Sequence, residues 1–161
     1  MLLMLGLLAL FIVVQYRRLE ATTLAYGGVV LGANTEELRS LLGDPQRIER
    51  RRWIYDIGGA RLYVDFDGSA RVASVTCSRD TSTLGSCPYA FGRTVGAKET
   101  DLTSRVGHPQ IEHATARTKL MIYTGVGFTF LLRDGRIDAI RHTAPRGGAA
   151  YWQVFALQAL P

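Results

Sequence analysis

The chain of 161 residues has few of the side chains that carry most enzyme chemistry. It contains three histidines and two cysteines, and it has no HExxH or CxxC spacing. It also lacks a GxSxG nucleophile motif and the glycine-rich fingerprints that bind phosphates or dinucleotides. We therefore predict a protein that is not an enzyme and that has no metal, no cofactor and no small-molecule substrate.

Lysine is nearly absent, so that arginine supplies 17 of the 19 Lys and Arg residues, and the formal net charge is +5. A guanidinium group pairs well with carboxylates and phosphates and stacks on aromatic rings. The net charge is nevertheless too small to indicate nucleic acid, and we predict none as a partner. The basic surface is either simply solvated or directed at an anionic surface.

Charge is missing altogether from residues 1–16, MLLMLGLLALFIVVQY. As a helix these residues would be roughly 24 Å long, against about 30 Å for the hydrocarbon core of a bilayer. One interpretation is a signal peptide, although the positively charged start of such a peptide is missing. The other, which we favour, is an uncleaved anchor that contacts the lipid bilayer and ends at Arg17 and Arg18.

No cysteine precedes Cys77, so we expect no lipid-modified N-terminal cysteine. Cys77 and Cys87 lie in a turn-rich stretch, which suits a local disulfide, and closing so short a loop stabilises a fold by about 2.8 kcal/mol. Disulfides persist in oxidising compartments. The two arginines after the anchor favour a cytoplasmic domain instead, but we give the cysteines more weight. We predict a single-pass inner-membrane protein with its folded domain on the periplasmic side.

The chain contains an internal repeat. Residues 31–46, LGANTEELRSLLGDPQ, and residues 95–110, VGAKETDLTSRVGHPQ, are identical at seven of sixteen positions with an offset of 64. Each copy predicts a short helix that begins after Asn34 or Lys98 and ends at a glycine shortly before a proline. Asn34 and Glu37 fit a capping box, whereas Lys98 has no acceptor for the first helical amides.

Alternating apolar residues follow each helix and predict three strands per copy. The predicted fold class is therefore α+β, with an N-terminal membrane-anchor helix followed by two tandem α-β-β-β units. The two units would form one antiparallel sheet with helices on one face. The predicted divisions are an anchor at 1–18, a linker at 19–31, a first repeat at 32–77, an inter-repeat loop at 78–95, a second repeat at 96–142, and a linker with an apolar tail at 143–161.

A glycine, a short capped helix that ends in Leu-Gly-x-Pro, an aromatic strand and a Phe-Asp-Gly turn resemble the SmpA/OmlA (BamE-like) domain. The same unit in tandem is also similar to the fold of the β-lactamase inhibitor protein. The resemblance implies a small non-enzymatic domain of the bacterial envelope whose sheet and loops bind another protein. It rests in the first copy on Gly32, Leu38, Leu42, Gly43, Pro45, Trp53, Tyr55, Phe66 and Gly68, and in the second copy on Gly96, Leu102, Gly107, Pro109, Tyr123, Phe130 and Gly135.

Three groups of residues are candidates for contact with a partner. Arginines beside aromatic rings are frequent at protein interfaces, although a charged strand is equally a device that keeps a sheet edge solvated. The second helix is a candidate because it departs from the first, and the apolar tail should pack on the protein's own sheet, on a partner or at a membrane surface. The candidates are Arg50, Arg51, Arg52, Trp53 and Tyr55 in the basic aromatic segment, Lys98, Arg105 and His108 around the second helix, and Tyr151, Trp152 and Phe155 in the tail.

These features favour a membrane-anchored, non-catalytic accessory or assembly subunit. It would dock a BamE-like domain onto a larger bacterial membrane protein complex, which is the expected integral membrane partner. The alternative is a periplasmic inhibitor or binding protein of a hydrolase, and it rests on similarity to the tandem inhibitor fold alone.

Overall fold

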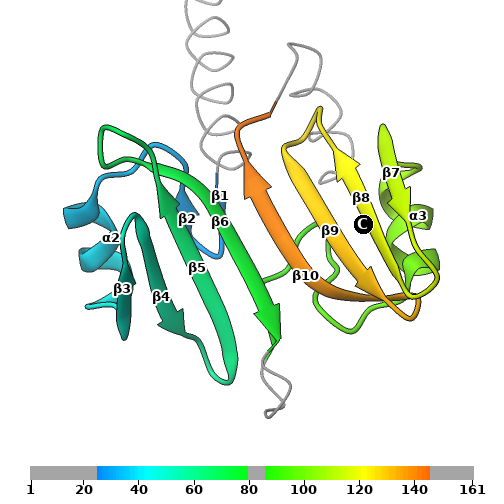
Figure 1. Ribbon diagram of the computed structural model, residues 1–161, viewed down its shortest axis with the longest axis horizontal. Helices are drawn as coiled ribbons and strands as arrows, with labels where there is room; N and C mark the ends of the chain where they lie inside the picture. Colours follow the sequence, from blue (N-terminus) through cyan, green and yellow to red (C-terminus); the bar gives the residue numbers. More distant parts are fainter. Residues whose placement is uncertain (1–24, 80–85, 146–161) are drawn as a thin grey trace, which may run out of the picture.

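The computed structural model describes residues 25–79 and 86–145. They form one eight-stranded antiparallel sheet, a separate two-stranded hairpin and two helices (Figure 1). The strand order in the large sheet is β3-β4-β5-β6-β10-β9-β8-β7. In chain order the elements are β1 (Ala25–Tyr26), β2 (Val29–Val30), α2 (Thr35–Leu42), β3 (Arg47–Glu49), β4 (Arg52–Asp56), β5 (Ala60–Phe66), β6 (Val72–Arg79), α3 (Glu99–Val106), β7 (Ile111–Ala114), β8 (Thr118–Tyr123), β9 (Phe128–Arg133) and β10 (Arg136–Thr143).

The two halves of the sheet repeat each other about the central pair β6 and β10. In each half, one helix is followed by four antiparallel strands, of which the last lies at the centre of the sheet. Matching long-range contacts connect the loop before each helix to the residue at, or directly before, the start of the last strand of its half. Arg71 Nη1 donates to the carbonyl oxygen of Gly32 at 2.9 Å, and Arg136 Nη1 donates to that of Gly96 at 2.9 Å. The internal repeat in the sequence thus corresponds to a repeat in structure.

Helix α2 begins at the capping box expected from Asn34. The Asn34 side chain accepts hydrogen bonds from the N–H groups of Glu36 and Glu37, both at 2.9 Å, and the Glu37 carboxylate accepts one from the N–H of Asn34 at 2.9 Å. The helix ends at Gly43, whose φ of 78° lies in the region that favours glycine. Before α3, Lys98 makes no capping hydrogen bond within the described residues. Helix α3 therefore begins with fewer of its first amides satisfied.

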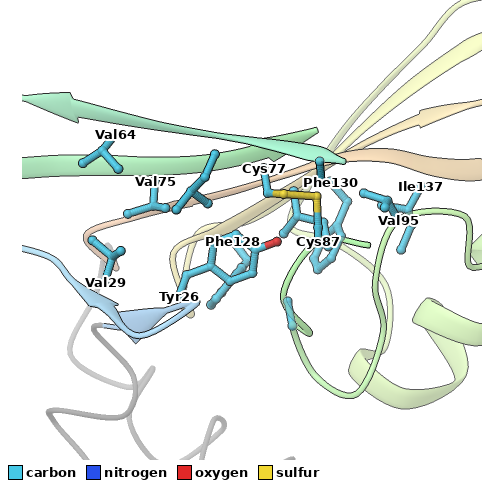
Figure 2. Close-up of a cluster of buried hydrophobic side chains, with 14 of the residues drawn as sticks. Tyr26, Val29, Val64, Val75, Cys77, Cys87, Val95, Phe128, Phe130 and Ile137 are labelled. Atoms are coloured by element: carbon cyan, nitrogen blue, oxygen red, sulfur yellow. A yellow bond between two sulfur atoms is a disulfide. The ribbon is translucent and has the colours of Figure 1, made fainter. Parts of the chain in front are cut away.

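One face of the sheet carries the core. Every second residue of the inner strands points toward it, and the β1-β2 hairpin and residues 86–97 cover its middle (Figure 2). Tyr26 of β1 meets Phe128 of β9 edge to face, with ring centroids 5.8 Å apart. Val29 of β2 is buried on the side of the sheet from which Val64 and Val75 project (Figure 2).

The expected disulfide between Cys77 and Cys87 is confirmed. Both cysteines are buried, and the bond joins β6 to the segment that covers the core (Figure 2). The Tyr26 hydroxyl donates to the carbonyl oxygen of Pro88 at 3.1 Å, and the Thr94 hydroxyl donates to that of Cys87 at 2.6 Å. The hairpin, the covering segment and the sheet are therefore fixed to one another.

The predicted α+β class with helices on one face is wrong, because the described structure is mostly β and its two helices have eight residues each. The helices lie at opposite ends of the sheet, α2 beside β3 and β4 and α3 beside β7 and β8 (Figure 1). A helix of this length covers about 12 Å, whereas eight strands extend over roughly 34 Å. The β1-β2 hairpin and residues 86–97 cover the middle of the sheet in their place.

Each half also has a fourth strand that we did not expect, β3 in the first half and β7 in the second. Both are short edge strands with largely exposed side chains, including Ile48 and Ile111. Such strands lack the alternation of buried and exposed residues by which a strand is recognised in a sequence.

Among the residues that the structure describes, no helix is long and apolar enough to cross a membrane. Helices α2 and α3 would cover about 12 Å each, against about 30 Å for a hydrocarbon core. The finding contradicts the predicted anchor helix and the single-pass inner-membrane location, and we withdraw both. Residues 1–18, to which the anchor was assigned, lie outside the described residues.

Candidate functional site

The face of the sheet opposite the core, here called the outer face, is formed by the residues that alternate with the core residues. The strand register places one such residue from each of the eight strands in a continuous row. The middle of this row is polar, and its second half ends in two isoleucines. In strand order the row consists of Arg47, Ile54, Tyr63, Thr76, Arg141, Thr129, Ile122 and Ile111.

A chain of hydrogen bonds crosses the outer face and joins four strands. Arg52 on β4 donates to both carboxylate oxygens of Asp65 on β5, from Nε at 2.6 Å and from Nη2 at 3.1 Å. The Ser74 hydroxyl on β6 donates to Asp65 Oδ2 at 2.9 Å, and Arg141 Nη2 on β10 donates to Ser74 Oγ at 3.3 Å. The Arg52 guanidinium also lies over the ring of Tyr63, 5.6 Å from its centroid. Arginines from both halves are thereby held in fixed positions on the sheet.

The electrostatics of this chain keep Asp65 ionised. Partial burial acts to raise the pKa of Asp65, but the hydrogen bonds from Arg52 and Ser74, with the charges of Arg52 and Arg141, hold it below its usual value. The hydrogen bond to Asp65 in turn raises the pKa of Arg52. A general acid or base works best with a pKa near the operating pH. This carboxylate is therefore suited to a structural ion pair and not to proton transfer.

The second half of the outer face contains an apolar groove of about 690 Å³. Leu120 and Ile122 of β8 and Leu131 of β9 line it, and all three are half-buried. Arg141 lines the groove where the groove borders the hydrogen-bond chain. Pro145, which follows the end of β10 in the sequence, also lines it. Apolar side chains gathered at a surface in this way are typical of a binding site.

The basic aromatic segment is divided between surface and core. Arg50 and Arg51 lie in the turn between β3 and β4, where Arg50 has a φ of 52°, so Arg51 lies outside the strand that carries the aromatic residues. Trp53 and Tyr55 are core residues with exposed fractions of 7% and 2%. Of these five candidates, Arg52 is the one that takes part in the outer face.

The candidates around the second helix lie at the other end of the molecule. Lys98 directly precedes α3, Arg105 is half-buried on it, and His108 is exposed in the turn before β7. Leu102 of helix α3 is fully buried and belongs to the core. The structure therefore does not bring these residues together with the basic aromatic segment. The remaining candidates, Tyr151, Trp152 and Phe155, lie outside the described residues.

Sequence reasoning missed most of the outer face. Alternation along β5 is enough to place Asp65 on the face opposite Phe66, but no local pattern connects Asp65 with Arg141 in the other half of the chain. The groove was missed because Leu120, Ile122 and Leu131 alternate with core residues that are equally apolar. Within residues 25–79 and 86–145, no group of three or more His, Cys, Asp or Glu side chains is placed to hold a metal ion.

No family model and no curated protein sequence matches the chain. A solved structure with a similar fold is that of a DUF4309 family protein, YjgB, from Bacillus subtilis, with a TM-score of 0.52 and 12% sequence identity. The similar region covers 73% of this chain and 83% of that chain. At this identity the likeness shows the fold alone, and the resemblance to the BamE-like domain stays a prediction.

Proposed function

We propose that the protein is a non-catalytic accessory or assembly subunit that docks on a larger protein complex through the outer face of its sheet. The observation that supports this best is the outer face itself, where arginines held by hydrogen bonds lie next to an apolar groove. Protein interfaces combine these two kinds of surface, since arginine and large apolar side chains contribute most of the binding energy.

The size of the outer face also supports binding to another protein. Eight strands at a spacing of about 4.8 Å extend over roughly 34 Å, and strands of about six residues are about 20 Å long. The resulting area of roughly 700 Å² is close to the roughly 800 Å² that each partner contributes to a stable complex of ordinary size.

A non-catalytic role is supported by the state of the charged groups on the outer face. The Asp65 carboxylate is engaged by Arg52 and Ser74, and a carboxylate held in this way is a poor general base at neutral pH. The resemblance to the SmpA/OmlA domain favours a complex of the bacterial envelope as the partner. This part of the proposal needs no membrane anchor in the chain itself.

The proposal is tested by affinity purification of the tagged full chain from its native cells, followed by mass spectrometry. Thr76 lies in the centre of the outer-face row, next to Arg141, and Thr76→Arg adds a bulky charge there. We expect this variant to lose the partner that the wild type retains. Thr100→Arg makes the same substitution at an exposed position on α3, and it should retain the partner. Equal recovery of the partner by both variants would contradict the proposal.

A further inference from the structure

The groove on the outer face accepts an occupant that is apolar and nearly uncharged. Leu120, Ile122 and Leu131 line it together with Ala139 of β10. Among the described residues that line it, Arg141 alone is charged, and this arginine is engaged by Ser74. Four threonines also line the groove, but with Arg141 as the one charged residue of the described lining, an occupant with several charges would lose hydration without gaining matching partners.

The chain leaves the sheet at this groove. Strand β10 ends at Thr143, and Ala144 and Pro145 line the groove. The exit is fixed, because the N–H of Thr143 donates to the carbonyl oxygen of Gly127 at 2.8 Å. Gly127 has a φ of 73° and lies so close to Thr143 and Pro145 that a Cβ atom at this position would collide with their backbone. The described part of the chain therefore ends beside the groove, at Pro145.

The residues that follow have the composition that the groove requires. Residues 146–161, RGGAAYWQVFALQALP, contain a single charge, at Arg146, and three aromatic side chains. Removing one aromatic side chain from water stabilises a structure by about 2 to 3 kcal/mol. Tyr151, Trp152 and Phe155 therefore strongly favour an apolar surface over solvent.

The groove is within reach of these aromatic residues. Strands β10 and β8 are separated by one strand, which places them about 10 Å apart. The four small residues 147–150 extend over up to about 13 Å. Tyr151 and the residues after it can therefore reach Leu120 and Ile122 on β8.

The first half of the outer face offers no equivalent surface. Arg47, Arg52 and Asp65 lie there, and an apolar segment placed over them would remove charged groups from water without replacing their hydration. Of the two halves of the outer face, the second, with the groove, is therefore the one that suits a mostly apolar segment that follows Pro145.

We infer that residues 146–161 bind in the apolar groove of their own chain. The inference rests on the proposed function and deepens it, because the external partner would then contact the polar half of the outer face, with Tyr63, directly, and the groove half through residues 146–161 bound there.

The test uses the full chain with photoreactive benzoylphenylalanine in place of Leu120. Irradiation of the purified protein should give an intramolecular adduct with a peptide from residues 146–161, and its yield should not change when the protein is diluted. Ile122→Asp in the groove should reduce the yield about tenfold or more, because a buried unpaired carboxylate opposes binding. Ile54→Asp is the matched control, since Ile54 occupies the corresponding place in the row of the first half. It should leave the yield unchanged.

An adduct whose yield falls on dilution would assign the groove to a second copy of the chain and overturn the inference. Adducts that avoid residues 146–161, or the absence of any adduct, would overturn it as well. Thermal unfolding checks that both aspartate variants fold. If Ile122→Asp does not fold, the dilution series on the chain with benzoylphenylalanine at position 120 tests the inference by itself. A failure here leaves the affinity purification unaffected, because that experiment measures capture of a different protein.

Discussion

Two arginine–aspartate pairs differ in exposure while sharing the same two-pronged geometry. Arg52 and Asp65 form the pair on the outer face. Arg117, directly before β8, and Asp134, in the β9-β10 turn, form an exposed pair in which Nε and Nη2 donate at 3.1 and 2.9 Å. The side chains of the second pair are 76% and 55% exposed, against 47% and 23% for the first. Exposed pairs contribute little because water screens them. We therefore expect the two pairs to differ in their contribution to stability.

The first prediction concerns Asp65→Asn, which should lower the free energy of unfolding at pH 7 by about 1 kcal/mol. Because folding lowers the pKa of Asp65, this contribution is present above the unfolded pKa of about 3.9 and is lost as pH falls through the folded value. Urea unfolding at pH 7 and at acidic pH checks both points. Asp134→Asn is the control and should change stability little. An equal loss in both variants would contradict the distinction.

The second prediction concerns Tyr123, whose hydroxyl donates to the carbonyl oxygen of Gly107 at 2.9 Å. Burial, with the charges of Glu99 and Glu112, raises the pKa of Tyr123 to about 12. Because the unfolded pKa is about 10, the folded state holds the proton more tightly, so this stabilisation is complete below about pH 10 and is lost as pH rises toward the folded value. Tyr123→Phe should cost about 1 kcal/mol at pH 7.

The pH dependence separates this effect from a simple loss of packing. Between pH 10 and pH 12, denaturant unfolding should show a smaller further loss of stability in Tyr123→Phe than in the wild type. Tyr89→Phe alters an exposed tyrosine and should follow the wild type throughout. If Tyr123→Phe runs parallel to the wild type over this range, the role assigned to the buried hydroxyl is wrong.

At the scale of the element, the two helices differ at their first residue. Asn34 caps α2, whereas Lys98 provides no cap for α3 in the described structure. The third prediction is that Asn34→Ala lowers the free energy of unfolding by about 1 kcal/mol, and that Lys98→Asn raises it by about 0.5 to 1 kcal/mol. Thermal and denaturant unfolding measure both changes. A neutral Lys98→Asn would mean that the backbone before α3 cannot place an asparagine side chain over the first turn.

The elements that were predictable are those with local causes. The helix that starts at Asn34 follows from its capping residues, and the core strands follow from alternation around Trp53 and Val64. The edge strands β3 and β7 were not predictable, since they are short and exposed on nearly all sides. Their pairing depends on the neighbouring strand and not on their own composition.

At the scale of the whole molecule, the disulfide fixes the covering segment to the sheet. The fourth prediction is that replacing both Cys77 and Cys87 by alanine lowers the free energy of unfolding by about 3 kcal/mol, because the unfolded chain is no longer cross-linked. Adding a reductant to the wild type should produce a similar loss and should leave the double variant unchanged. If the double variant unfolds at the same denaturant concentration as the oxidised wild type, the disulfide does not contribute to stability.

The candidate site was less predictable than the fold, because it belongs to no single segment. The hydrogen-bond chain needs Arg52, Asp65 and Ser74 from the first half and Arg141 from the second, and only the pairing of β6 with β10 brings them together. Alternation in the sequence shows which residues share a face, but the covering by β1, β2 and residues 86–97 decides which face is the core. Trp53 and Tyr55, expected at an interface, are buried on that same face beside α2, where the Arg39 guanidinium lies over the Trp53 ring.

The central claim is that the outer face binds another protein, and site-specific photo-crosslinking tests it most directly. Benzoylphenylalanine replaces Tyr63 on the polar half of the outer face, and in a control chain it replaces Tyr89 on the segment that covers the core. After irradiation in the native cells, we predict that Tyr63 gives an adduct with one specific foreign protein and that Tyr89 gives none with it. Equal labelling of that protein from both positions, or no foreign adduct from Tyr63, would contradict the account.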